Sequence, residues 1–204
     1  MNNNMNTFKN TITKNIIIII ILYIIPVFLI ISNIISFRYR FIILGIVGLL
    51  TILSAFLKKT TWNEIGCRRN NLIPAIKNII PITAICTVLS ILYYHFYGAR
   101  IDNSGIPVYF YVFYMLVSAP LQEFLYRSYI FYILSEINLS RYFLIISPVL
   151  YALAHLIYND ILTVILSLII GIYWAYHYRQ FKNLYSIAFS HIVLGIVAIA
   201  TGIL

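Results

Sequence analysis

The chain carries little charge for its length. Of its 204 residues, 9% are charged and 62% are hydrophobic, whereas an ordinary globular chain is about 25% charged. This composition excludes a soluble domain with a wet surface. The five acidic residues are outnumbered by fourteen Lys and Arg, which gives a net charge of +9. No soluble module is there to present that charge to a nucleic acid. We therefore expect the lipid bilayer as partner, with basic residues in short loops where they set the orientation.

Cysteine is also scarce. The chain has two, Cys67 in a basic loop and Cys86 in an apolar segment. Neither belongs to a CxxC pair or a Cys/His tract, so we expect no disulfide framework and no structural zinc site. The HExxH pattern, which is the strong sequence signature of a catalytic zinc, is missing as well.

Long hydrophobic runs dominate what is present. A helix needs about 20 apolar residues to cross the hydrocarbon core, and the chain offers about seven such segments. The runs are continuous rather than alternating, which argues against a membrane β-barrel. The predicted fold is an all-α polytopic transmembrane bundle, and six or eight spans remain open because one segment is short and one connection is tight. The predicted spans are 15–35, 41–57, 72–92, 108–134, 142–158, 161–178 and 184–204.

The chain divides into a polar cytoplasmic tail (1–14), two N-terminal transmembrane helices (15–60) and a functional core (61–204). Lys9 and Lys14 precede a long apolar run, as in a signal peptide. The run from Ile16 to Ile31 is longer than the usual apolar region of about 7–15 residues, and no small-x-small cleavage site follows it. We therefore expect a first transmembrane helix that is retained.

Basic residues are distributed unevenly between the two sets of loops. This asymmetry predicts a cytoplasmic N-terminus in a bacterial cytoplasmic membrane and, for seven spans, an external C-terminus. The bacterial source is inferred from a composition rich in Ile, Asn and Lys. The predicted cytoplasmic set is Lys9, Lys14, Lys58, Lys59, Arg68, Arg69, Arg141, Arg179 and Lys182; the external set is Arg38, Arg40 and Arg100.

Glu123 and Arg127 lie four residues apart inside the predicted span 108–134. A charge at the centre of a bilayer costs about 2.5–3.5 kcal/mol by insertion scales. At this spacing the two side chains share one helix face, with the acid in the more favourable N-terminal position. Glu123 is a candidate general base that activates water, with Arg127 keeping it ionised. The alternative is a purely structural ion pair, although such pairs stabilise poorly compared with apolar packing.

Two histidines also lie in apolar segments. His155 follows Tyr151 by four residues, so the two share a helix face, and nearby Asp160 is a candidate hydrogen-bond partner for His155. His191 lies inside the last span. Two further histidines, His95 and His177, lie at predicted loop edges, where we expect them to be solvated.

Glu123, His155 and His191 come from three predicted helices and could converge in one cavity. Hydrolysis inside a membrane needs water, a base that deprotonates it and donors that stabilise the oxyanion. The same three residues could hold a divalent metal such as zinc. Without HExxH we expect no required cofactor, and the metal remains an alternative.

The order of these motifs resembles the CPBP family of intramembrane proteases, which includes CAAX prenyl endopeptidases and bacteriocin-processing or self-immunity proteins. The resemblance runs from about Trp62 to the C-terminus and is carried by Glu123-x-x-x-Arg127, Tyr151-x-x-x-His155 and the helix of His191. It implies a hydrolase in which Gln122, Glu123, Arg127, His155 and His191 form the catalytic site, acting on a membrane-associated peptide or protein.

Three positions depart from the family pattern. Gln122 stands where the resemblance implies a first glutamate, Tyr151 replaces the usual Phe, and Gly195 stands where Asn or Asp is usual. In the family the first glutamate is commonly taken as the base and the Asn as an oxyanion donor. Gln cannot accept a proton at neutral pH, and Gly has no side-chain donor.

Three functions remain open at this point. The first is an intramembrane endopeptidase with Glu123 as base, and the second is a catalytically degenerate protein that binds a partner or confers bacteriocin self-immunity. The third is a transporter whose polar residues line an ion path, against which stands the lack of an inverted repeat. The sequence leaves open the substrate, which could be a prenylated C-terminus, a leader peptide or a signalling-peptide precursor, and the oligomeric state.

Overall fold

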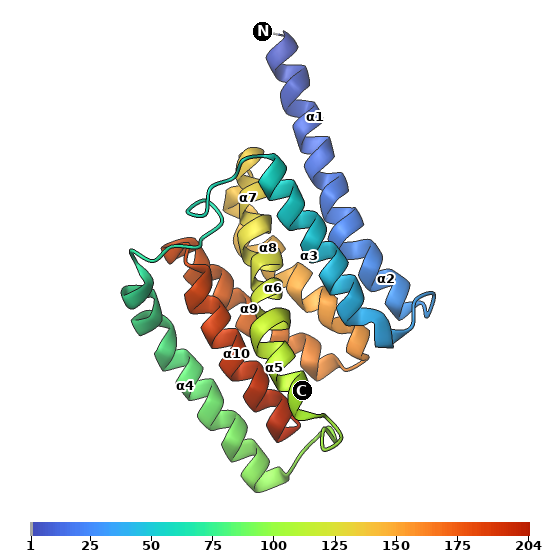
Figure 1. The fold of residues 1–204 in the computed structure, drawn as a ribbon, viewed down its shortest axis with the longest axis vertical. Helices are drawn as coiled ribbons and strands as arrows, with labels where there is room; N and C mark the ends of the chain where they lie inside the picture. Colours follow the sequence, from blue (N-terminus) through green and yellow to red (C-terminus); the bar gives the residue numbers. More distant parts are fainter. Residues whose placement is uncertain (1) are drawn as a thin grey trace.

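The computed structural model describes residues 2–204, with side chains from Lys9 onward, and this part of the chain is helical without a β-strand (Figure 1). Seven helical segments are long and apolar enough to cross a membrane, which confirms the predicted class and the number of spans. They are Lys9–Ile31, Phe37–Leu57, Leu72–Tyr97, Val108–Glu136, Ser140–Tyr158, Ile161–Phe181 and Leu184–Thr201.

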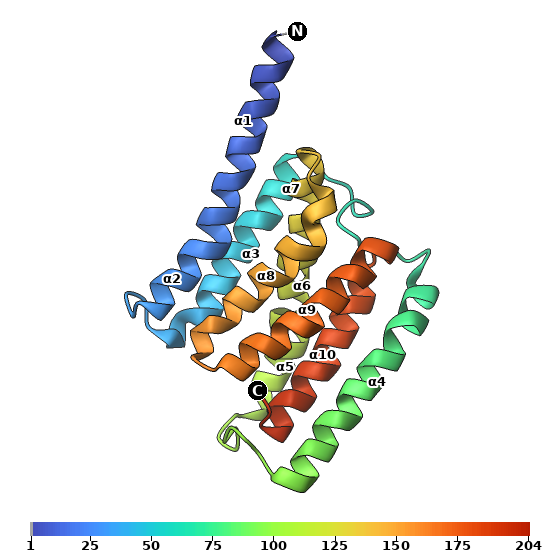
Figure 2. The ribbon, with the colours of Figure 1, turned by 180° about the vertical axis from the view of Figure 1, so that it is seen from behind.

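The first helix is longer than the apolar run alone. α1 (Asn2–Ile19) continues through a π-helical turn (Ile20–Ile24) into α2 (Ile25–Ile31). Much of the polar tail predicted for residues 1–14 is therefore the first part of this helix, and Met1 lies outside the described residues. In both views the start of α1 extends beyond the rest of the bundle (Figures 1 and 2).

The fourth span lies at the centre of the bundle. It consists of α5 (Val108–Phe113), α6 (Ala119–Glu123) and α7 (Ile130–Glu136), joined by π-helical turns at Tyr114–Ser118 and Phe124–Tyr129. Every residue from Glu123 to Ile130 is buried, so neighbours surround this stretch on all sides. Single π-helical turns occur frequently at functional sites, and here two of them flank Glu123.

The other helices pack around this one. α3 (Arg40–Leu57) contacts α6, and α10 (Leu184–Thr201) contacts both α6 and α4 (Leu72–Tyr97). α8 (Phe143–His155) and α9 (Ile161–Phe181) lie side by side, and both views place α4 at the edge of the bundle beside α10 (Figures 1 and 2). Polar side chains of α6, α8 and α10 can therefore meet in the interior.

The loops between the helices lie at two ends of the bundle, as the distribution of basic residues predicts. At one end Lys58 pairs with Glu136, whose carboxylate also accepts a bond from Asn15, and Asn183 donates to the Arg68 carbonyl. At the other end the Phe37 ring lies against Tyr158, while Arg100 pairs with Asp160 and donates to the Ile203 carbonyl. Which end faces the cytoplasm remains a prediction.

Asp160 has two structural partners at this second end. Its carboxylate accepts bonds from both Arg100 Nη atoms at 2.8 Å, and it caps α9 by accepting the Thr163 amide at 2.8 Å. The hydrogen bonds from Arg100, and next those from Thr163, hold the pKa of Asp160 below its usual range.

We expect Asp160→Ala to lower the melting temperature of the protein in detergent, since loss of a helix N-cap costs about 1 kcal/mol. Because the folded pKa is depressed, the stabilisation by Asp160 is complete above the unfolded pKa of about 3.9 and is lost as the pH falls below it. Melting curves at pH 7 and pH 3 test this. The gap between wild type and variant should shrink at pH 3, and a gap that is the same at both pH values would contradict the assignment.

Candidate active site

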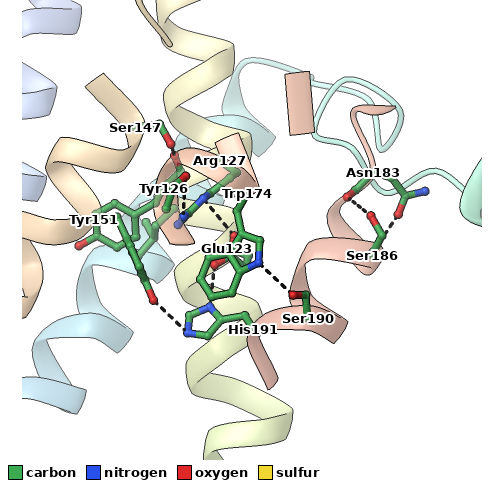
Figure 3. A network of polar contacts seen from close by, with 12 residues as sticks. Glu123, Tyr126, Arg127, Ser147, Tyr151, Trp174, Asn183, Ser186, Ser190 and His191 are labelled. Atoms are coloured by element: carbon green, nitrogen blue, oxygen red, sulfur yellow. Dashed lines mark hydrogen bonds and ion pairs between the residues drawn. The ribbon is translucent and has the colours of Figure 1, made fainter. Parts of the chain in front are cut away.

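Four of the five predicted catalytic side chains lie on the central span and on α10. Gln122 and Glu123 are in α6, Arg127 is in the π-helical turn that follows it, and His191 is in the middle of α10; the fifth, His155, is the last residue of α8. Figure 3 shows the Glu123, Arg127 and His191 side chains pointing toward one another.

Glu123 links the central span to α10. Its Oε1 lies 2.6 Å from Nδ1 of His191, and because an ionised carboxylate only accepts hydrogen bonds, the proton is on Nδ1 of the imidazole. This contact leaves Nε2 of His191 as the basic nitrogen. A carboxylate behind an imidazole in this way fixes its tautomer and orientation and stabilises the imidazolium that forms when Nε2 takes a proton.

Arg127 pairs with the other carboxylate oxygen. Its Nε lies 3.2 Å from Glu123 Oε2, and both side chains have no exposed surface. The contact is electrostatic rather than a well-directed hydrogen bond, since Arg127 Nε and Glu123 Oε2 have no hydrogen-bond partner within the described residues. The Arg127 guanidinium lies over the rings of Tyr151, at 4.3 Å, and Trp174, at 5.2 Å. Aromatic faces attract a desolvated cation, so these rings stabilise the buried guanidinium.

His191 is held on every side. Its Nε2 lies 3.2 Å from the Tyr151 hydroxyl, and its ring stacks on Trp174 with centroids 4.7 Å apart. The Trp174 indole donates to Ser190 Oγ at 3.0 Å, and Ser190 is 2.7 Å from Thr83 Oγ1 on α4. Neither Trp174 nor Ser190 belongs to the site residues predicted from the sequence. An indole N–H in the middle of an apolar span, which needs an acceptor when buried, was the available signal.

His155 has its proton fixed in the same manner. Its Nδ1 lies 2.8 Å from the Tyr151 carbonyl oxygen, and because a carbonyl only accepts, Nε2 carries the free lone pair. His155 and Gln122 both line a cavity of about 90 Å³ between α2, α3 and the end of α8. This volume exceeds the roughly 10–15 Å³ that one water needs. Glu123 and His191 do not line it.

Two expectations about histidine are wrong. Asp160 does not bind His155, because the carboxylate is engaged by Arg100 and caps α9. His177 is not solvated: it has no exposed surface, and its ring nitrogens lie 3.0 Å from Asn78 Oδ1 and 2.9 Å from Ser186 Oγ. α9 continues to Phe181, beyond the predicted end at residue 178, so His177 lies inside the helix and against α10. His95 is exposed, as expected.

Within the described residues, no group of three His, Cys, Asp or Glu side chains is placed to hold a metal ion. Glu123 and His191 bind each other, and Nδ1 of His155 binds a backbone carbonyl. A zinc held jointly by Glu123, His155 and His191 remains a prediction.

Comparison with known proteins found a family match for the segment that contains the site. Residues 104–197 match the family model of the Rce1-like type II CAAX prenyl endopeptidases. No curated protein and no solved structure matches the chain. The matched segment is slightly less than half of the chain, and it holds all five predicted catalytic residues, which confirms the resemblance there. The segment that carries the site, residues 104–197, is therefore similar to the Rce1-like type II CAAX prenyl endopeptidases, a family of membrane proteases.

Proposed function

We propose that the protein is an intramembrane endopeptidase that hydrolyses a peptide bond of a membrane-associated peptide or protein. The observation that carries the proposal is the fully buried contact between Glu123 and His191, with Arg127 on the other carboxylate oxygen. Apolar packing would stabilise the bundle at least as well as this ion pair, which favours a chemical role for the costly polar groups.

Glu123 activates water through His191 in this mechanism, because the carboxylate itself has no exposed surface. Water bound at Nε2 of His191 attacks the carbonyl carbon of the scissile bond, and Nε2 takes the water proton. Glu123 stabilises the imidazolium that forms. When the C–N bond breaks, Nε2 returns the proton to the leaving amine, so that one carboxylate terminus and one amine terminus result. Arg127 stays paired with the other carboxylate oxygen of Glu123 throughout.

The cavity beside α6 supplies the water. Gln122 and His155 are among its polar lining residues, and the Gln122 amide and Nε2 of His155 can both form hydrogen bonds to water. Tyr151 connects the two histidines, since its carbonyl binds His155 and its hydroxyl binds His191. Water passes from the cavity to His191 along this residue.

One observation favours a second function, a degenerate protease that binds membrane peptides without cutting them. Of the adjacent residues Gln122 and Glu123, only Gln122 lines the cavity, and its amide cannot accept a proton. The carboxylate of Glu123 is instead enclosed between Arg127 and His191. In this alternative the Glu123–Arg127–His191 cluster would only hold the central span against α10.

Mass spectrometry of new protein N-termini in membranes distinguishes the two functions. Cells that carry wild type should show termini that are absent from cells with Glu123→Ala. These termini would also identify the substrate and its cleaved bond. Identical sets of termini in the two samples would contradict the peptidase and support the binding protein.

Tyr151→Phe should raise the yield of these termini. The Tyr151 hydroxyl occupies Nε2 of His191 at 3.2 Å, and water must take its place before it can be activated. One neutral hydrogen bond is worth about 0.5–1.5 kcal/mol net, so its removal should increase cleavage by a factor of about 2–10. Tyr142→Phe, at the exposed start of the same span, is the control and should leave the yield unchanged. A fall in cleavage with Tyr151→Phe would show that the hydroxyl takes part in the reaction.

A further inference from the structure

Tyr114 is a buried tyrosine that takes no part in the hydrogen bonds or ion pairs of Glu123, Arg127 and His191. It lies in the first π-helical turn of the central span, and 9% of its surface is exposed. Its ring packs edge to face against His191 with centroids 5.9 Å apart. Its hydroxyl makes no hydrogen bond within the described residues, and unlike the Tyr178 hydroxyl it is not fully enclosed, so another molecule can reach it.

Gly195 creates the space for this hydroxyl. A Cβ built at position 195 would overlap the Tyr114 hydroxyl and would lie 2.6 Å from its Cε1. Gly195 follows His191 by four residues, so the two positions share one face of α10, one turn apart. The hydroxyl therefore lies on the face of α10 that carries the imidazole, in the place that a side chain at residue 195 would fill.

We propose that Tyr114 is a catalytic hydrogen-bond donor, which binds the carbonyl oxygen of the scissile bond as that oxygen becomes negative. This inference rests on the proposed peptidase function. The hydroxyl gives up no proton in the step: it strengthens one hydrogen bond while water adds to the carbonyl carbon and Nε2 of His191 takes the water proton. An unpaired donor that is already in place beside the imidazole is available for such a developing charge and needs no reorganisation when the charge forms.

The Tyr114 hydroxyl differs from other hydroxyls of the bundle in its surroundings. The Tyr23 hydroxyl donates to the Leu125 carbonyl at 2.9 Å, and the Ser147 hydroxyl donates to the Tyr126 carbonyl at 2.7 Å. Tyr114 instead leaves its donor free beside the imidazole of the proposed base. The space that a side chain at residue 195 would fill is thus occupied by the Tyr114 hydroxyl, which comes from another span.

The test compares the yield of new N-termini in membranes of cells with Tyr114→Phe and with wild type. Loss of one oxyanion donor lowers turnover by about 10²–10³-fold, and Tyr114→Phe should show a loss of this size with an unchanged melting temperature. Tyr109→Phe, which removes an exposed hydroxyl from the same span, should change neither quantity.

A second experiment moves the hydrogen-bond donor from residue 114 to residue 195, and its result would not change if Tyr114 only packed against His191. Gly195→Asn alone should eliminate cleavage, because the new side chain overlaps Tyr114. Combined with Tyr114→Leu, which removes the obstructing ring, Gly195→Asn supplies an amide donor from α10. This double variant should cleave at least tenfold more than Tyr114→Leu alone. Gly45→Ala is the control for a helical glycine, since nothing lies within 4 Å of its added Cβ, and it should be neutral.

The outcomes separate the two proposals. Full cleavage by Tyr114→Phe, or a double variant no better than Tyr114→Leu alone, would overturn the role of Tyr114 and leave the peptidase intact. A wild type that produces no new termini would overturn both proposals together.

Discussion

Glu123→Gln should abolish cleavage and also destabilise the protein. Without the carboxylate, His191 loses the group that fixes its tautomer and stabilises its imidazolium, and general-base catalysis contributes about 10²–10⁴-fold. The same change leaves Arg127 charged, fully buried and without a counter-ion. Breaking a buried pair by removing one partner costs about 3–5 kcal/mol. The yield of new N-termini and the melting temperature in detergent measure the two effects.

A double variant separates chemistry from folding. Glu123→Gln combined with Arg127→Met removes both charges, and replacing a buried pair by apolar groups is often neutral or stabilising. The melting temperature should therefore return toward that of wild type, while cleavage stays absent. Glu136→Gln is the matched control: this glutamate ends the same span, where it pairs with Lys58, and cleavage should persist. A double variant that regains both stability and cleavage would show that the pair is only structural.

The spans were predictable because the requirement behind them is simple. A bilayer demands about 20 apolar residues per helix, and the sequence supplies seven such runs. Helix ends were less predictable, since packing can extend a helix past its apolar run. α9 continues through the polar residues Arg179 and Gln180 to Phe181. That extension buries His177, which the sequence alone places at a loop edge.

The pair of Glu123 and Arg127 was also predictable, because four-residue spacing on a helix brings side chains together whatever the fold. The contact of Glu123 with His191 spans 68 residues and depends on how α10 packs against α6. The enclosure by Trp174 and Tyr151, and the place of the Tyr114 hydroxyl at Gly195, depend on interhelical distances that no sequence spacing encodes. The departures at Gln122 and Gly195 were visible in the sequence, and their consequences needed the packing.

Gln122→Glu should increase cleavage about 10–100-fold over wild type. Gln122 lines the cavity that also contains His155, and its amide is bound to Ser118 Oγ at 2.9 Å. A carboxylate at this position would meet water directly and could take its proton without relay through His191. Adjacent helix positions point about 100° apart, so the new carboxylate would not compete with Glu123 for Arg127. General-base catalysis of about 10²–10⁴-fold sets the upper limit of the gain.

This variant also tests the balance between cutting and binding. Gln180→Glu adds the same charge at an exposed site on α9 and should leave the yield of new N-termini at the wild-type level. If wild type yields no termini and Gln122→Glu produces them, the native protein binds peptides with an intact scaffold that lacks only its base. If both cleave equally, residue 122 has no part in proton transfer. A gain on top of measurable wild-type cleavage is the expected result, because the proposed base, Glu123 with His191, would already act in the wild type.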